Sequence, residues 1–297
     1  MDRHPTPKVV YSCSFIPMEW IAAHELFPCR ITPGVDELHN AAGVCPYAEG
    51  FGRKRKDDPS IVAYVLTTLC DPMRRILEWM KCDSEESLFL FNLPSTWQSQ
   101  SARQYYADEL QRLGKFLVRL QGNSPTPAKL AQVMRCFDSA RQFLISSRRN
   151  YSSRTYADAI LDFQQKGISA ISIPNFQECD GGIPLAVLGG PILKNDLSIF
   201  DVIEQAGGWV ALLGTENGER GFPARFDADR LSDDPFEELI HAYFDEIPDP
   251  SRRPNDQLYS WLSQEISARQ IRGMIVLYYP WCDLWHAEIH RIKETFS

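Results

Sequence analysis

The sequence predicts an α/β protein of two domains with mainly parallel sheets, joined by a helical segment. Two blocks of the chain alternate strand-like and helix-like runs, the pattern of parallel sheets with crossover helices. Between these blocks, apolar residues recur at helical spacing. We therefore expect an N-terminal domain over residues 1–97, a helical segment over 98–165 and a C-terminal domain over 166–297. A chain of this length can bury two cores.

The first block contains three apolar runs that are typical of buried strands, at residues 9–11, 61–66 and 88–91. Each run is short, rich in Val, Ile, Leu or Phe, and bounded by polar or turn residues. Helices are expected over 17–24 and 71–80, because Pro and Asp suit the first turn of a helix. The block therefore predicts a parallel sheet with its crossover helices.

The middle of the chain predicts three helices. The first carries apolar residues at i, i+3 and i+4 spacing over 105–120, and Gly122 and Pro125 stop it. The second begins near Pro127, and the third covers 156–163. We expect these helices to join the two α/β domains or to cover the first.

Strand and helix alternate again in the second block. Strands are expected at 184–188, 209–213 and 274–279, and helices at 197–206, 236–244, 258–271 and 282–296. The short helix at 236–244 lies inside a polar, acidic and proline-rich stretch. This block predicts the second parallel sheet.

Composition excludes several classes of protein. The formal net charge of −8 argues against nucleic acid as the main partner, since a phosphate backbone requires a basic surface. No apolar run resembles a signal peptide or approaches the roughly 18 residues of a membrane span. We therefore expect a soluble, cytoplasmic protein. The eight cysteines are then not a disulfide framework, and they contain no Cys-x-x-Cys pair.

Three cysteines share a position at expected helix starts. Cys70 and Cys282 each follow a strand-like run, and Cys45 also precedes a helix-like run. The positive end of a helix dipole favours the thiolate, which is the form that binds metal. Three such thiolates would suit an iron–sulfur cluster with one iron open to another ligand. The alternatives are a zinc site that includes His286, and three unrelated buried thiols.

Two further cysteines, Cys13 and Cys29, are ambiguous, because they lie at or beside expected strands.

Several motifs of the chain, taken together, resemble the subunit family of the 2-hydroxyacyl-CoA dehydratases and class I benzoyl-CoA reductases. These motifs cover residues 11–20, 27–31, 45–48, 68–75, 184–191, 206–210, 218–220 and 279–283. Their order and rough spacing resemble the family over nearly the whole chain.

The resemblance implies that Cys45, Cys70 and Cys282 ligate one [4Fe–4S] cluster in the cleft between the domains. It implies an electron transfer at low potential from the cluster to an acyl-CoA substrate, as in anaerobic metabolism. The electron would come from a separate ATP-dependent iron–sulfur activator. The chain itself has no Gly-x-x-x-x-Gly-Lys-Ser/Thr loop for ATP.

Five other residues are weaker candidates. Glu19, at the first strand-to-helix turn, is expected to face the cleft and could transfer a proton, or it could simply suit the helix dipole. Ser14 could hydrogen-bond a carbonyl group or cap the helix. Arg53 and Lys54 belong to a basic cluster that could bind CoA phosphates or the activator, or form a solvated surface. Arg220 lies in a loop that the family uses near its cleft.

The chain departs from the family pattern at its end. Family members continue past the third cysteine with another strand and a long helix, whereas this chain ends one helix length after Cys282. We therefore expect an uncovered sheet edge and a dimer, formed with a homologous subunit or with itself. Two alternatives to a dehydratase or reductase subunit stay open. One is a redox protein of the double-cubane type that acts on small molecules other than CoA esters, and the other is a cluster-free structural partner.

Overall fold

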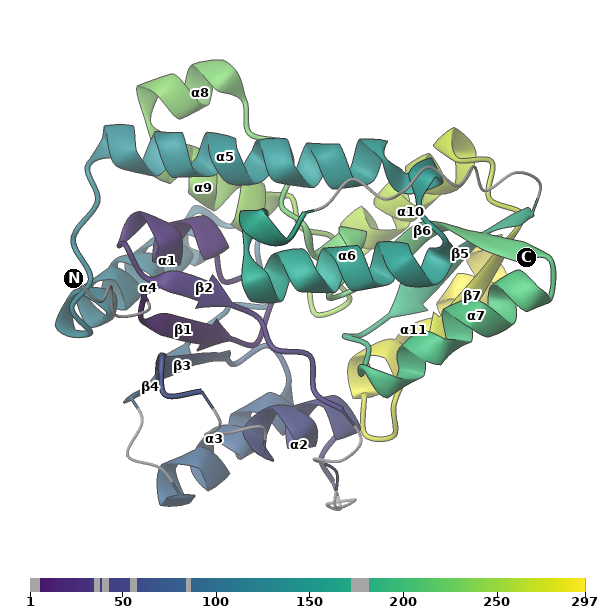
Figure 1. Ribbon diagram of the computed structural model, residues 1–297, viewed down its shortest axis with the longest axis horizontal. Helices are drawn as coiled ribbons and strands as arrows, with labels where there is room; N and C mark the ends of the chain where they lie inside the picture. The colour runs from purple at the N-terminus through teal and green to yellow at the C-terminus, as the bar shows by residue number, and fades with distance from the viewer. Residues whose placement is uncertain are drawn as a thin grey trace.

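The computed structural model of the protein describes residues 6–34, 38, 43–53, 58–83, 87–171 and 182–296. It contains two sheets, one in each half of the chain, and every strand pair in the described residues is parallel (Figure 1). The predicted α/β fold with two mainly parallel sheets is therefore confirmed. Within these ranges, the structure has no helix of the length and apolar character needed to cross a bilayer.

The first sheet has the strand order β2-β1-β3-β4. Its strands are β1 (Lys8–Tyr11), β2 (Phe27–Cys29), β3 (Ile61–Thr67) and β4 (Ser87–Phe91). The two central strands are buried, and Val10 of β1 pairs with Tyr64 of β3. The short strand β2 is not among the predicted strands. It contains Pro28, which lacks the N–H of a ladder hydrogen bond and is accommodated because β2 is an edge strand.

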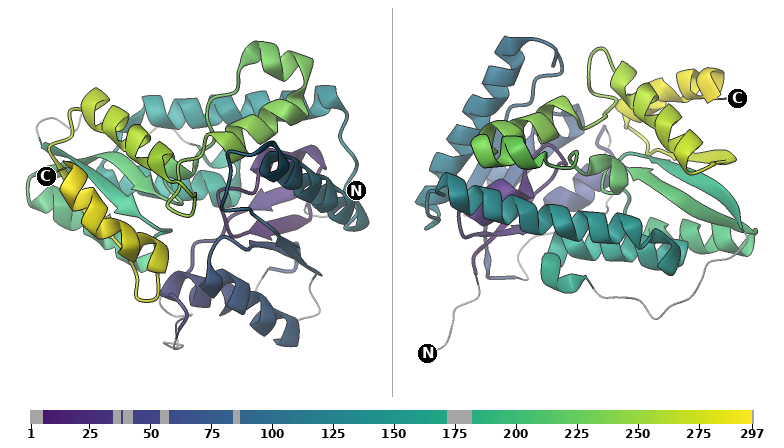
Figure 2. Two further views of the ribbon diagram at one scale, coloured as in Figure 1. Left: turned by 180° about the vertical axis from the view of Figure 1, so that it is seen from behind. Right: turned by 90° about the horizontal axis from the view of Figure 1, so that it is seen from above.

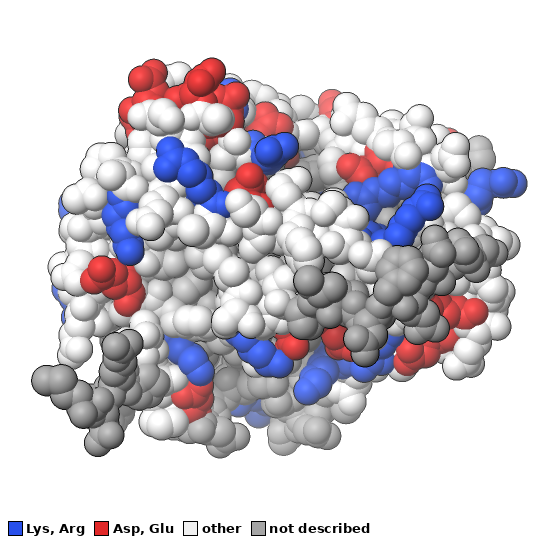
Figure 3. Space-filling view, turned by 45° about the horizontal axis from the view of Figure 1, so that its top comes forward, with Lys and Arg blue, Asp and Glu red and all other residues white. Residues whose placement is uncertain are grey.

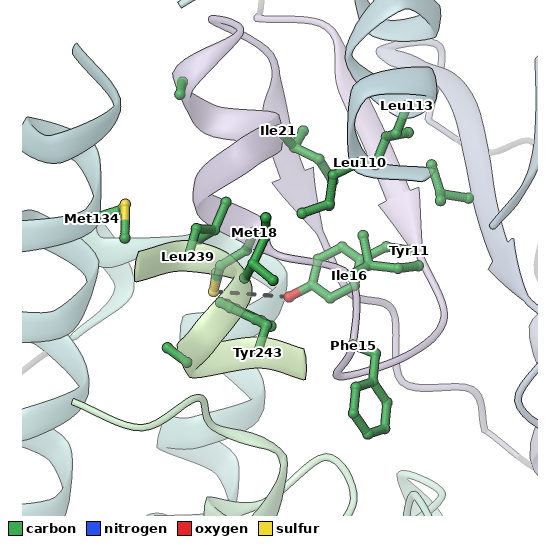
Figure 4. Close-up of a cluster of buried hydrophobic side chains, with 14 of the residues drawn as sticks. Tyr11, Phe15, Ile16, Met18, Ile21, Leu110, Leu113, Met134, Leu239 and Tyr243 are labelled. Atoms are coloured by element: carbon green, nitrogen blue, oxygen red, sulfur yellow. Dashed lines mark hydrogen bonds between the residues drawn. The ribbon is translucent and has the colours of Figure 1, made fainter. Parts of the chain in front are cut away.

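Helices cover both faces of the first sheet (Figure 1). They are α1 (Met18–Ala23), α2 (Pro46–Arg53), α3 (Asp71–Asp83), α4 (Gln100–Arg119) and α5 (Pro127–Ser146). Successive side chains of a strand point to opposite faces. Val9 and Tyr11 therefore pack toward α1, α4 and α5, whereas Val10 packs toward α2 and α3. In the first of these cores, the Tyr11 hydroxyl lies 4.0 Å from the Met18 sulfur (Figure 4).

The predicted helical segment is observed, and its helices start at polar caps. The side chains of Ser99 and Thr126 accept N–H groups at the starts of α4 and α5, and Ser152 does so for α6 (Ser153–Lys166). Whereas α4 and α5 pack on the first sheet, α6 contributes Ile160 and Leu161 to the core of the second. The segment thus connects the two halves of the fold.

A later segment returns to the first sheet. It contains α8 (Ala228–Asp233), α9 (Pro235–Ile240) and a π-helix (His241–Asp245). Its apolar residues, including Leu239 and Tyr243, belong to the same core as Tyr11 (Figure 4). Figure 2 shows α8 and α9 beside α5. Figure 3 shows acidic side chains gathered over this corner of the molecule. The range expected for the C-terminal domain therefore also supplies part of the first core.

The second sheet has the strand order β6-β5-β7. Its strands are β5 (Ile183–Gly189), β6 (Gly208–Thr215) and β7 (Gly273–Leu277), and its own helices are α7 (Ser198–Gln205), α10 (Asp256–Ala268) and α11 (Asp283–Phe296). Short 3-10 turns lie at Arg148–Asn150, Ile168–Ala170, Asn195–Leu197 and Glu219–Gly221. The central strand β5 ends at Gly189, where φ is +154° and a Cβ atom would lie 2.2 Å from the Leu277 carbonyl oxygen.

Candidate functional site

The strands of both sheets end around one cavity of about 230 Å³. Ligands of open parallel sheets bind at this carboxyl edge. Loops after β1, β3, β5, β6 and β7 all line the cavity, so both halves of the chain contribute to it. The lining includes Ser12, Cys13, Cys45, Thr67, Leu69, Cys70, Pro72, Gly190, Pro191, Glu216, Arg220, Asp249, Trp281, Cys282 and Trp285.

All three cysteines singled out from the sequence line this cavity. Each lies directly before a helix: Cys45 before α2, Cys70 before α3 and Cys282 before α11. Each also caps its helix, because its sulfur accepts the backbone N–H three residues further on. The donors are Ala48 at 3.5 Å, Met73 and Trp285. The local geometry expected from the sequence is therefore present at all three positions.

Burial dominates the titration of these thiols. It raises the pKa of Cys45 to about 11, and it also raises the pKa of Cys70 and Cys282. The capping N–H groups lower each pKa, but by less than burial raises it. Burial thus opposes the thiolate that the sequence predicts at these helix starts. A metal must displace protons when it binds.

The three thiols also influence one another. A charge on Cys282 raises the pKa of Cys45, and charges on both of them raise the pKa of Cys70. In the described ranges, no three His, Cys, Asp or Glu side chains form a group that could hold one metal ion.

The zinc alternative required His286 as a ligand. Within the described structure, His286 is exposed and its ring stacks on Tyr278, with centroids 5.7 Å apart, instead of lining the cavity. The geometry therefore does not support a zinc site formed by Cys282 and His286.

Arg220 lies at the cavity, but the protein itself occupies most of its hydrogen-bond donors. Its side chain is 1% exposed, and Nη1 donates to Asp249 Oδ2 at 2.7 Å. Nε donates to the Gly214 carbonyl at 3.1 Å, and Nη2 donates to the Gly189 carbonyl at 3.2 Å. The positive charge of Arg220 lowers the pKa of Cys282, against the effect of burial. Substrate binding by Arg220 stays a prediction.

Sequence reasoning missed a buried ion pair that joins the two halves beside the cavity. Arg30, just after β2, pairs with Glu216, just after β6, and both side chains are almost fully buried. Glu216 lines the cavity, and its Oε1 accepts the Ser14 N–H at 2.8 Å. Arg30 lies within the motif at residues 27–31, and that motif was the sequence signal for it. Its partner Glu216, 186 residues away, lies in none of the motifs.

The expectation that Glu19 faces the cleft is not met. Its side chain is buried in the first core, where it pairs with Arg141 and accepts the Tyr243 hydroxyl at 2.6 Å. It does not line the described cavity. The Ser14 hydroxyl is buried without a hydrogen-bond partner in the described structure, beside a much smaller hollow. It does not cap α1, which starts after Pro17.

The basic cluster is only partly described. Arg53 ends α2 and pairs with Glu49, with Nε 3.1 Å from Oε1. It does not line the cavity in the described part of the chain. Lys54 lies outside the described residues.

Comparison with known protein families gives one match over almost the whole chain. Residues 13–297 match the family described as 2-hydroxyglutaryl-CoA dehydratase, D-component. This range includes every residue named above as lining the cavity except Ser12. A search of curated proteins gave no match.

Proposed function

This chain belongs to the 2-hydroxyglutaryl-CoA dehydratase D-component family, and from that premise we propose that it is the cluster-bearing subunit of an enzyme acting on CoA thioesters. One observation carries the proposal. Cys45, Cys70 and Cys282, from distant parts of the chain, line a single cavity between the two sheets. Their soft sulfur donors suit a [4Fe–4S] cluster.

In this proposal the three cysteines hold the cluster as thiolates, after their protons are released. The cluster, when bound, supplies single electrons at low potential to the thioester. The capping N–H groups at the start of each helix stabilise the negative charge on the sulfurs. The positive charge of Arg220 acts in the same direction on Cys282.

The surroundings of the cysteines support a site that excludes water. Leu69, Pro72, Pro191 and Trp285 give the cavity a largely apolar lining. Exclusion of water protects reactive reduced species and strengthens electrostatic interactions. The buried Arg30–Glu216 pair fixes the two halves against each other, so Cys282 is held opposite the cysteines of the first half.

We propose two partners: a homologous subunit or second copy, and an ATP-dependent iron–sulfur activator that donates electrons. Support for the first comes from β7, which pairs only with β5 in the described structure. Its residues are all partly exposed, and Tyr278 beyond its end is 51% exposed. Support for the second is the family itself, since a D-component implies further components.

The test begins with anaerobic purification and measurement of iron, acid-labile sulfide and zinc. We expect about four irons per chain, as one cubane requires. Cys45→Ala, Cys70→Ala and Cys282→Ala should each lose most of the iron. Cys29→Ala is the matched control, because Cys29 is buried in the same half and lies outside the described cavity lining.

Full iron retention in all three variants, or stoichiometric zinc in the wild type, would contradict the cluster. Activity is tested next, with a reductant, the partner subunit and a panel of 2-hydroxyacyl-CoA and aromatic CoA esters. We expect a thioester to change the electron paramagnetic resonance spectrum of the assembled complex. An unchanged spectrum across the panel would favour a redox protein that acts on other small molecules.

A further inference from the structure

A fourth cysteine lines the same cavity. Cys13 follows strand β1 at the centre of the first sheet, and it is 3% exposed. Cys29 is the last residue of the neighbouring edge strand β2. It is similarly buried, but it is not part of the described cavity lining. Cys13 and Cys29 are therefore both buried, but only Cys13 is part of the described cavity lining.

Cys13 resembles the other three cysteines in its local structure. Its sulfur accepts the backbone N–H of Phe15, and its carbonyl oxygen accepts the Ile16 N–H at 3.2 Å. The sulfurs of Cys45, Cys70 and Cys282 likewise accept N–H groups from residues shortly after them. Such N–H contacts stabilise a metal-bound thiolate and tune the potential of iron–sulfur clusters.

The sheet places Cys13 next to one of the proposed ligands. Strands β1 and β3 are neighbours, and the Ser12 N–H donates to the Val65 carbonyl at 3.1 Å where they end. Cys13 follows the first of these strands and Cys70 follows the second. A charge on the Cys13 sulfur is felt at Cys70, as are charges on Cys45 and Cys282.

We propose that Cys13 is the fourth thiolate ligand of the cluster held by Cys45, Cys70 and Cys282. This inference rests on the proposed cluster and narrows its role. With four sulfur ligands no iron is open to substrate, so the chain relays electrons to a partner subunit that binds the thioester. Ligation is an exchange without electron transfer: the thiol releases its proton to solvent, sulfur bonds to the fourth iron, and a water molecule leaves that iron.

The test uses mild oxidation of the anaerobically purified protein. A cubane whose fourth iron holds only water loses that iron readily and becomes a paramagnetic three-iron cluster, whereas four thiolates retain it. Wild type, Cys13→Ala and Cys29→Ala are each treated with one equivalent of ferricyanide. We expect the three-iron signal of Cys13→Ala to be at least about tenfold larger than that of the other two.

Addition of ethanethiol to Cys13→Ala should restore resistance, because the external thiolate replaces the missing side chain. Cys13→Ser preserves the size of the residue and serves as a second variant if Cys13→Ala folds poorly, as judged by circular dichroism. The wild-type result decides the inference in either case. Wild-type protein with four irons that converts readily would overturn the role of Cys13 alone. Wild-type protein without iron would instead refute the proposed cluster.

Discussion

The two sheets differ in how completely they are buried, and the two halves of the chain contribute differently to the cavity. In the first sheet, the central strands β1 and β3 lie between two layers of helices, and most of their residues are inaccessible. In the second sheet, every residue of β7 is partly exposed. Three of the four cavity cysteines come from the first half, and only Cys282 follows the exposed strand. The first half therefore provides a rigid base, and the second half closes the cavity over it.

The most severe test of this comparison removes one buried ionic link between the halves. Glu216→Gln would leave Arg30 buried without its counter-charge, which costs about 3–5 kcal/mol when one partner of a buried pair is lost. We expect a loss of stability of that size in urea unfolding, together with a lower iron content. Lys81→Gln, which breaks an exposed pair with Glu78, should cost at most about 1 kcal/mol. A Glu216→Gln variant as stable as this control would show that the halves hold together without the pair.

Matched core substitutions compare the two sheets directly. Leu66 of β3 is fully buried, and Leu66→Ala should cost about 2–5 kcal/mol because it leaves a cavity that cannot collapse. Leu277 of β7 is only partly buried, so Leu277→Ala should cost less than half as much. Urea unfolding of both variants measures the ratio. Equal losses would mean that β7 is as tightly packed as β3.

Self-association tests the exposed edge of the second sheet. Met274, Val276 and Tyr278 line a groove of about 450 Å³ along β7 and α11, and exposed strand edges favour pairing with another chain. Tyr278→Lys should weaken a dimer at least about tenfold, or roughly 1.4 kcal/mol, in sedimentation experiments. Tyr105→Lys, at an exposed position of α4 in the other half, is the control. Monomeric wild-type protein at high concentration would contradict this edge as a contact.

The smallest expected effect concerns the start of the first sheet. Hydrogen bonds from Lys8 and Ser60 lower the pKa of Asp58 to about 2 from 3.8. Because the folded pKa lies below the unfolded value, this stabilisation is present above pH 3.8 and is lost as the pH falls toward 2. The pair is partly exposed, so Asp58→Asn should cost at most about 1 kcal/mol at pH 7. The difference from wild type should vanish near pH 2, and a constant difference would exclude the ionic cause.

Regular periodicity made most of the fold predictable. The strands before Cys70 and Cys282 are apolar runs between turn residues, so their positions and the helix starts after them could be read locally. Strand β2 was not predictable in this way, because it has three residues and contains Pro28. The return of the acidic segment around Tyr243 to the first core depends on contacts distant in sequence.

Contacts between residues distant in sequence also limited the prediction of the candidate site. Helix-start patterns identified three cysteines, because their chemistry and local position were both visible. Glu19 also lies at a helix start. Its side chain, however, is buried in the first core, where it pairs with Arg141, 122 residues away. Cys13 does not stand directly before a helix, because α1 starts only at Met18, so its place at the cavity emerges only when β1 and β3 are side by side.

The capping role of the cysteine sulfurs bears on how the protein would survive oxygen damage. Small zinc domains unfold when metal leaves, because the metal alone holds them together. Here each sulfur already satisfies an N–H group of its own helix without metal, as Cys45 does for Ala48. The helices α2, α3 and α11 therefore have their starts secured in the apoprotein. We therefore expect that, if the proposed cluster were lost to air, the chain would stay folded and could take up a new cluster without being refolded.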